Sequence, residues 1–132
     1  MSDRTARVDK PDFAVYERKA DEFYASMVDA SQRGHWAAAC SNAVHCVISS
    51  CDAIAVRILG ERSSGKSHDE AVRLLAKARP PGFEEKLHQI RDILSLKSKA
   101  EYGSEMPSRG RTELAVKQAA RVYRWAKETV RK

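Results

Sequence analysis

The amino-acid sequence predicts an all-α fold, a bundle of helices without a β-sheet. Its longest apolar stretch, residues 36–59, repeats apolar side chains with the period of a helix. No segment alternates apolar and polar residues with period two, and no turn dipeptide joins two β-branched runs. The chain has 132 residues, 42% of them hydrophobic and 32% charged, which suits a soluble globular domain with a core. We therefore expect one helical domain.

Residues 36–59 form the predicted central helix. Apolar or small side chains occupy most of its circumference, so other helices must cover it on several sides. Polar residues interrupt the stretch, and Asp52 and Arg57 lie near its end, so we do not expect it to cross a membrane. One face follows the helical period and consists of Trp36, Cys40, Ala43, Val47, Cys51, Ile54 and Ile58.

Four further helices are predicted around the central one. Gly34 ends the first, Ser67 and Glu70 form a capping box that opens a short one, and Pro80 ends that short helix. The other two span about 83–101 and 110–131, and the first spans about 12–33. Residues 1–11 are polar, so we expect a disordered N-terminal arm followed by a single domain of residues 12–132.

Three cysteines, Cys40, Cys46 and Cys51, lie on the central helix. Their number is odd, and their spacing matches neither a disulfide framework nor a Cys-x-x-Cys metal site. We interpret them as buried thiols of a protein in the reducing cytoplasm. The N-terminus carries no apolar run that would predict a signal peptide or membrane anchor. No metal site and no cofactor is predicted.

Residues 60–67 match the G-x-x-x-x-G-K-S pattern of a phosphate-binding P-loop. In such a loop Lys66 would contact phosphates and Ser67 would hold Mg²⁺, but the motif works only between a strand and a helix of a parallel sheet. Here the preceding apolar run is helical, and no later segment resembles a strand ending in aspartate. We interpret the match as chance and the segment as a loop between helices.

Arg62 and His68 form another candidate site, that of a metal-independent ribonuclease. The histidine would transfer protons at the 2′-hydroxyl group, and the arginine would stabilise the charged phosphate of the transition state. In the alternative interpretation, Arg62 is a solvated surface residue and His68 belongs to the first turn of the next helix.

Positive charge is concentrated near the C-terminus. The net charge is +6, and residues 109–132 hold 8 Lys and Arg against 2 Glu, whereas residues 1–108 are balanced. A basic helical face can bind a phosphate backbone, although such faces are also often only solvated. On the last helix, five basic side chains project within about 60° of one direction: Lys117, Arg121, Arg124, Arg131 and Lys132. The predicted nucleic-acid-binding residues are Lys97, Lys99, Tyr102, Arg109, Arg111, Lys117, Arg121, Arg124 and Arg131.

Four sequence features together resemble the HEPN superfamily, specifically its small stand-alone bacterial members. Their order and spacing carry the resemblance, which covers most of residues 14–130. The features are the Ala-rich helix AAACSNAVHCVISSCDAIAVRILG, the segment SHDEAVRLL, the segment LSLKSKAEYG, which is similar to a basic-x-x-A-x-Y-G signature, and the Ala-rich last helix.

The resemblance implies an antiparallel bundle of about four to five helices, commonly dimeric. Many members of the superfamily are ribonucleases, toxins paired with antitoxins, or RNA- and nucleotide-associated helpers. Catalytic members carry an Arg and a His separated by about four to six residues, close to the start of the final core helix. In this chain that neighbourhood, residues 97–102, contains no histidine, and Arg62 and His68 lie one loop earlier.

We therefore expect a non-catalytic HEPN-like domain that binds RNA or a protein partner, in a toxin–antitoxin, defence or stress-response setting. One alternative is a ribonuclease toxin that uses Arg62 and His68. Another is a purely structural module whose basic face meets an acidic protein. A homodimer is also expected, because the apolar face of residues 36–59 is wide and Trp125 lies off the inner face of the last helix.

Overall fold

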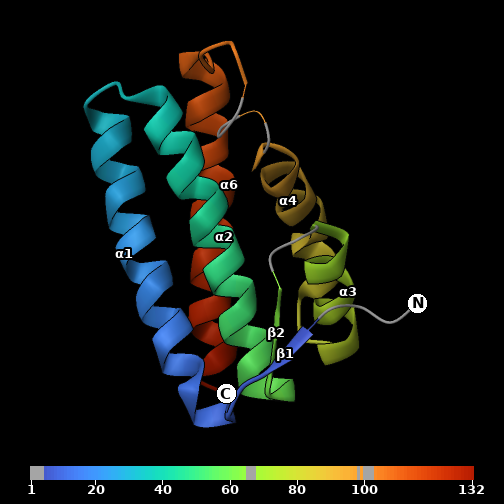
Figure 1. Ribbon diagram of the computed structural model, residues 1–132. Coiled ribbons are helices and arrows are strands. Elements are labelled where there is room, and N and C mark those ends of the chain that lie inside the picture. The colour runs from blue at the N-terminus through green and yellow to red at the C-terminus, as the bar shows by residue number, and fades with distance from the viewer. Residues whose placement is uncertain (1–4, 65–67, 98, 100–102) are drawn as a thin grey trace.

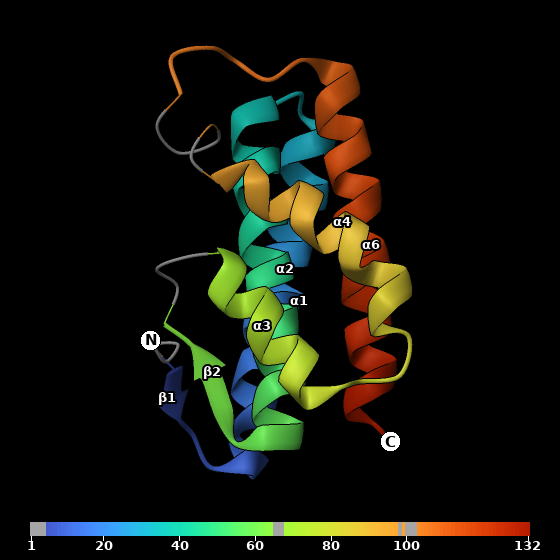
Figure 2. The same ribbon diagram turned by 90° about the vertical axis from the view of Figure 1, so that its right-hand side faces the viewer.

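The domain is a helical bundle built around one long helix, α2 (Figure 1). The computed structural model describes residues 5–64, 68–97, 99 and 103–132. Within these residues α2 contacts each of the other helices, with α1 and α6 running beside it and α3 and α4 packed across it (Figure 2). The helices are α1 (Phe13–Gln32), α2 (Trp36–Leu59), α3 (His68–Ala78), α4 (Phe83–Ser95) and α6 (Arg109–Val130).

The prediction of a central, widely covered helix is confirmed. Every residue of α2 from 51 to 56 is buried. Met27 of α1, Leu75 of α3, Ile90 of α4 and Val122 of α6 belong to the same core cluster, so four helices contribute to its cover. Burial of these side chains is the main source of stability in a domain of this size.

Helix α2 is also long and apolar enough to pass a test for membrane spans. Its mean hydropathy over the best window is 1.3, and 67% of that window is buried inside the domain. The core helix of a globular domain passes the same test, because burial in protein and burial in lipid select similar side chains.

The expectation of no sheet is wrong, because two short strands pair. Strand β1 (Thr5–Arg7) runs antiparallel to β2 (Glu61–Ser63), with Thr5 opposite Ser63. The backbone N–H of Val8 continues the contact by donating to the carbonyl of Gly60 at 2.8 Å. In the segment predicted to be an N-terminal arm, Thr5–Arg7 form this strand, and a 3-10 turn follows at Lys10–Asp12.

One helix end differs clearly from the predicted one, and one predicted helix cap is only partly described. Helix α4 ends at Ser95, earlier than the expected position near 101, and Leu96 is its C-cap. The expected capping box includes Ser67, which lies outside the described residues. Its partner Glu70 is buried and accepts hydrogen bonds from the backbone N–H and the hydroxyl of Ser64, which ties β2 to the start of α3.

Trp125 is buried, contrary to the expectation that it lies exposed off the inner face of α6. Its Nε1–H donates to the carbonyl of Pro81 at 2.8 Å, in the turn that precedes α4. Gly82 in that turn has a φ of +82°, and a Cβ there would lie 3.1 Å from the Trp125 Nε1. The chain itself therefore covers the indole, so Trp125 no longer supports a homodimer, which stays a prediction.

Candidate functional site

The predicted nucleic-acid-binding residues do not form one surface. Arg109 and Arg131 are held in ion pairs, and Lys99 and Arg111 line a pocket. Lys97 makes a contact within the domain, and Tyr102 lies outside the described residues. The remaining three, Lys117, Arg121 and Arg124, are exposed along α6 and are named here the outer basic stripe.

Part of the positive charge of α6 is used to hold α1. Lys127 contacts Asp21 at 2.7 Å, and Arg131 contacts Glu17 at 3.3 Å. Tyr123 also donates to Asp21, at 2.5 Å. Burial raises the pKa of Asp21, but the hydrogen bonds from Lys127 and Tyr123 outweigh burial and hold this pKa below its usual value. These contacts are structural, because each cation already has an acidic partner.

The outer basic stripe follows from the helical period. Lys117, Arg121 and Arg124 are separated by four and three residues, which places them on the same side of the helix. Ala119 and Val122 between them are fully buried against the core, so the stripe faces away from the bundle. Among the described residues, no acidic side chain forms an ion pair with any of the three.

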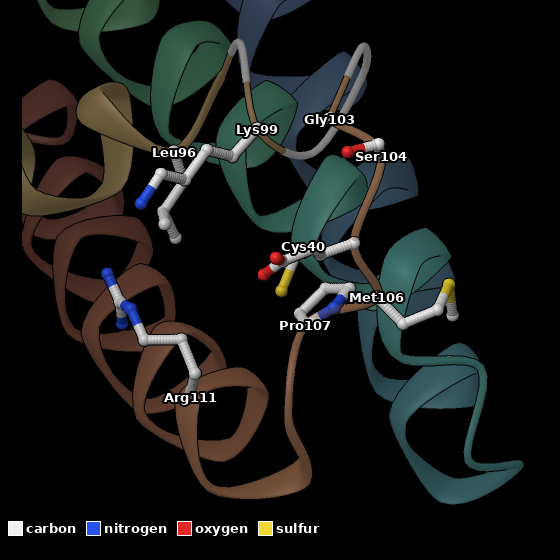
Figure 3. Close-up of a pocket in the computed structure, with 9 residues that line it drawn as sticks. Cys40, Leu96, Lys99, Gly103, Ser104, Met106, Pro107 and Arg111 are labelled. Carbon is white, nitrogen blue, oxygen red and sulfur yellow. The ribbon is translucent and has the colours of Figure 1, made fainter.

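A pocket of about 380 Å³ lies at the end of the bundle where α2 and α6 begin (Figure 3). It is named here the α4–α6 pocket. Cys40 near the start of α2 lies in its wall, and the Sγ of this cysteine is 3.5 Å from the Thr112 hydroxyl. Among the described residues its lining consists of Cys40, Leu96, Lys99, Gly103, Ser104, Glu105, Met106, Pro107 and Arg111.

Two cations meet in the α4–α6 pocket from different parts of the chain. Lys99 follows α4, whereas Arg111 belongs to the first turn of α6, where Ser108 is the N-cap and accepts from the Arg111 N–H at 3.0 Å. Figure 3 shows the Lys99 ammonium and the Arg111 guanidinium on the same side of the pocket. The Nη1 of Arg111 is buried and has no hydrogen-bond partner within the described part of the chain. A buried unpaired donor costs about 1–3 kcal/mol, more when charged, so this arrangement suits an anion.

A comparison with known protein families shows which family the chain belongs to. The HEPN domain matches residues 15–129 of the sequence. The chain belongs to the HEPN domain family. The mostly helical bundle agrees with this membership, and the resemblance predicted from the sequence is confirmed. A comparison with curated proteins gave no match.

In this HEPN domain, the structure describes the side chain of Arg62 but not that of His68, its predicted partner. The guanidinium of Arg62, on β2, donates to the carbonyl of Ser63 at 3.0 Å and lines a hollow shared with Lys19 and Asp52. His68 is the first residue of α3, but its side chain lies outside the description. The ribonuclease interpretation of this pair therefore stays a prediction.

The P-loop match lies in a context that does not suit it. Gly60 is the left-handed C-cap of α2, with a φ of +69°, so the segment follows a helix rather than a strand. Strand β2 within the segment belongs to a two-stranded antiparallel sheet, whereas a P-loop requires a parallel one. Residues 65–67, which include Lys66, lie outside the described residues.

Asp52 is a buried titratable residue whose role the sequence does not predict. Its Oδ1 accepts from the backbone N–H of Ser63 at 3.0 Å and from the Ser63 hydroxyl at 3.1 Å, which fastens β2 onto α2. Burial raises the pKa of Asp52 to about 6, although the hydrogen bonds from Ser63 and the charge of Arg62 act in the opposite direction. The sequence feature that could have indicated this role is a single acidic residue inside an apolar helical stretch.

No cluster of three or more His, Cys, Asp or Glu side chains in the described ranges is arranged to hold a metal ion. The three cysteines are buried and free within these ranges. Burial raises the pKa of the Cys46 thiol to about 12, so this thiol is neutral and unreactive near pH 7.

Proposed function

We propose that this HEPN domain is a non-catalytic RNA-binding module that contacts phosphates through its outer basic stripe. The observation that carries the proposal is the exposure of Lys117, Arg121 and Arg124 on one face of α6 without acidic partners among the described residues. Other basic residues of the same helix, such as Arg109 and Arg131, are neutralised by carboxylates of the domain.

The length of the stripe is appropriate for a nucleic-acid strand. Arg124 follows Lys117 by seven positions, so at 1.5 Å per residue the stripe extends about 10 Å along the helix. A nucleic-acid strand in a duplex presents a phosphate about every 3.4 Å of its axis, so three cations can reach three phosphates at once. Side chains on a convex helical face position a backbone but do not read bases. Binding is therefore independent of sequence.

The absence of a histidine from residues 97–102 supports the non-catalytic part of the proposal. Catalytic members of the family place their histidine in this region, as the resemblance implied. Proton transfer at the 2′-hydroxyl group needs a side chain that changes protonation near neutral pH, and histidine is the residue type whose ordinary pKa lies there.

Reversing the charge of the stripe is the direct test. The double variant Arg121→Glu with Arg124→Glu removes two of three phosphate contacts and adds repulsion, so we expect it to weaken binding to every RNA by at least about 30-fold. The fold should persist, because both side chains are exposed. Fluorescence anisotropy with labelled single-stranded RNAs of different sequence measures the effect.

A matched control separates local contact from net charge. The double variant Arg18→Glu with Arg33→Glu makes the same change in net charge at Arg18 of α1 and at Arg33, the C-cap of that helix, where the side chains are 84% and 66% exposed. It should retain nearly the affinity of the wild type. Equal losses in both double variants would argue against the stripe and for a diffuse charge effect.

The ribonuclease alternative makes a different prediction in the same assay. If Arg62 and His68 form an active site, wild-type protein shortens the labelled RNA, and His68→Ala abolishes that cleavage while binding survives. A wild type that neither binds nor cleaves RNA would contradict both proposals. The remaining hypothesis would then be that the domain binds a protein partner.

A further inference from the structure

We propose that the hollow between α1, α2 and β2 is a binding site for a free amino acid with an apolar side chain. It is named here the α1–β2 hollow, after the two elements that both pack against α2 (Figure 1). None of the residues of the outer basic stripe lines it, so the inference goes beyond the RNA-binding proposal and can be tested separately. The charges, the apolar walls and the size of the hollow carry the inference.

The α1–β2 hollow contains charges of both signs. Its described lining includes two cations, Lys19 of α1 and Arg62 of β2. It also includes two carboxylates, Glu22 of α1 and Asp52 of α2. These formal charges cancel, so a phosphate group or a polycation would meet two groups of its own sign. A free amino acid carries one ammonium and one carboxylate group near pH 7, and therefore complements such a site.

The two cations of the hollow can bind the carboxylate of the ligand. Nη1 of Arg62 donates to the Ser63 carbonyl at 3.0 Å, and this guanidinium makes no further hydrogen bond among the described residues. Nζ of Lys19 lies 5.3 Å from the centre of the Tyr16 ring. No carboxylate within the described ranges forms an ion pair with either cation. A guanidinium holds a carboxylate with two parallel N–H donors, so Arg62 is the main contact and Lys19 adds a point charge.

Asp52 is the group that would bind the ammonium group of the ligand. It is 8% exposed, and burial raises its pKa although Lys19 and Arg62 act in the opposite direction. The domain therefore compensates the charge of this carboxylate only in part, and a ligand ammonium group would compensate it further. Glu22 differs, because the guanidinium of Arg18 already lies 3.5 Å from it. Asp52 is therefore the acid that selects a ligand with an amino group.

The walls and the size of the hollow suit an apolar side chain beside the two charged groups. Tyr16 and Phe23 of α1 and Ile48 of α2 supply apolar surface. The Phe23 ring stacks on the His45 ring, with 5.1 Å between their centres, which holds it in place. The volume of the hollow is about 610 Å³, within the range of about 300–1,000 Å³ that small-molecule sites occupy. An amino acid as large as phenylalanine therefore fits.

Calorimetric titration with L-phenylalanine tests the site, with two analogues that each lack one charged group. 3-Phenylpropanoate has the carboxylate but no amino group, and 2-phenylethylamine has the amino group but no carboxylate. We expect L-phenylalanine to bind at least about tenfold more tightly than either analogue, because only the amino acid forms both charge-assisted contacts. Equal affinity for all three compounds would contradict the proposal.

Variants of the lining residues assign each charged group of the ligand to its partner. Arg62→Gln should weaken L-phenylalanine at least about tenfold and remove its advantage over 2-phenylethylamine, because the carboxylate loses its main contact. Asp52→Asn should weaken L-phenylalanine to a similar degree and remove its advantage over 3-phenylpropanoate. Lys19→Gln, at an exposed position, should also weaken L-phenylalanine. Arg121→Gln, a matched loss of one arginine outside the hollow, should leave the affinity unchanged.

The proposal is overturned if L-phenylalanine does not bind, or if its affinity depends on neither Arg62 nor Asp52. Circular dichroism distinguishes lost binding from lost structure. Both variants should remain helical, because Arg62 is only partly buried and asparagine at position 52 keeps an acceptor for Ser63. The charge-reversed variant of the outer basic stripe should bind L-phenylalanine like the wild type, so this proposal and the RNA-binding proposal can fail independently.

Discussion

Replacing Cys51 by aspartate is expected to unfold the domain. Cys51 is 3% exposed, in the stretch of α2 that is buried on every side. Burial, followed by the nearby Asp52 and Cys46, raises the pKa of this thiol well above its usual value, so the site strongly disfavours negative charge. An unpaired carboxylate there costs several kcal/mol, which is comparable to the total stability of about 5–15 kcal/mol.

Far-UV circular dichroism and urea denaturation measure this effect, with Cys51→Ala as the control. The alanine variant removes one sulfur atom without adding charge, so it should remain folded with a loss of about 1–2 kcal/mol. A folded Cys51→Asp protein with the denaturation midpoint of the wild type would show that the centre of α2 is not buried as described.

Asp52 should make the free energy of unfolding depend on pH. Because its folded pKa is about 6, above the usual value of 3.8, the native state holds a proton that the unfolded chain releases. The proton bound to Asp52 therefore adds its full contribution to the free energy of unfolding below about pH 4. This contribution is lost as the pH rises through about 6. Between pH 4.5 and 7.5 the loss amounts to about 2 kcal/mol.

The variant Asp52→Asn isolates this contribution. An asparagine oxygen can still accept from Ser63, but it does not ionise. Urea denaturation gives the free energy of unfolding of each protein. The value for the variant minus the value for the wild type should therefore rise by about 2 kcal/mol from pH 4.5 to pH 7.5. Taking the difference between the two proteins removes the opposite trend of Asp21, whose pKa is lowered. An identical difference at both pH values would contradict a titrating Asp52.

Helical periodicity was sufficient to predict the bundle and its central helix. The repeat from Trp36 to Ile58 is long, and every residue of α2 from 49 to 56 is buried. Such a pattern can be recognised from the sequence of one helix alone, without knowing which elements pack against it. The β1–β2 pair had no comparable signal. Its strands have three residues each and are polar, and Thr5 pairs with Ser63 far along the chain.

The side chains that the sequence misplaced are those whose partner lies on another element. Trp125 lies off the inner face of α6, but the turn at Pro81 covers it. Arg131 was grouped with the basic face, yet Glu17 of α1 attracts it. Lys99 and Arg111 were predicted as basic residues, but their convergence on one pocket depends on how α4 and α6 pack. Periodicity gives directions around a helix, not the identity of the neighbour.

The salt dependence of RNA binding by the wild-type protein tests the RNA-binding proposal most directly. Three phosphate contacts on single-stranded RNA predict that log K falls with log [salt] with a slope of about −2, so raising salt from about 50 to about 200 mM should weaken binding about 20-fold. The RNA should remain intact throughout the titration. Affinity that is absent or indifferent to salt, or RNA that is shortened during the measurement, would contradict a non-catalytic domain that binds RNA through its outer basic stripe.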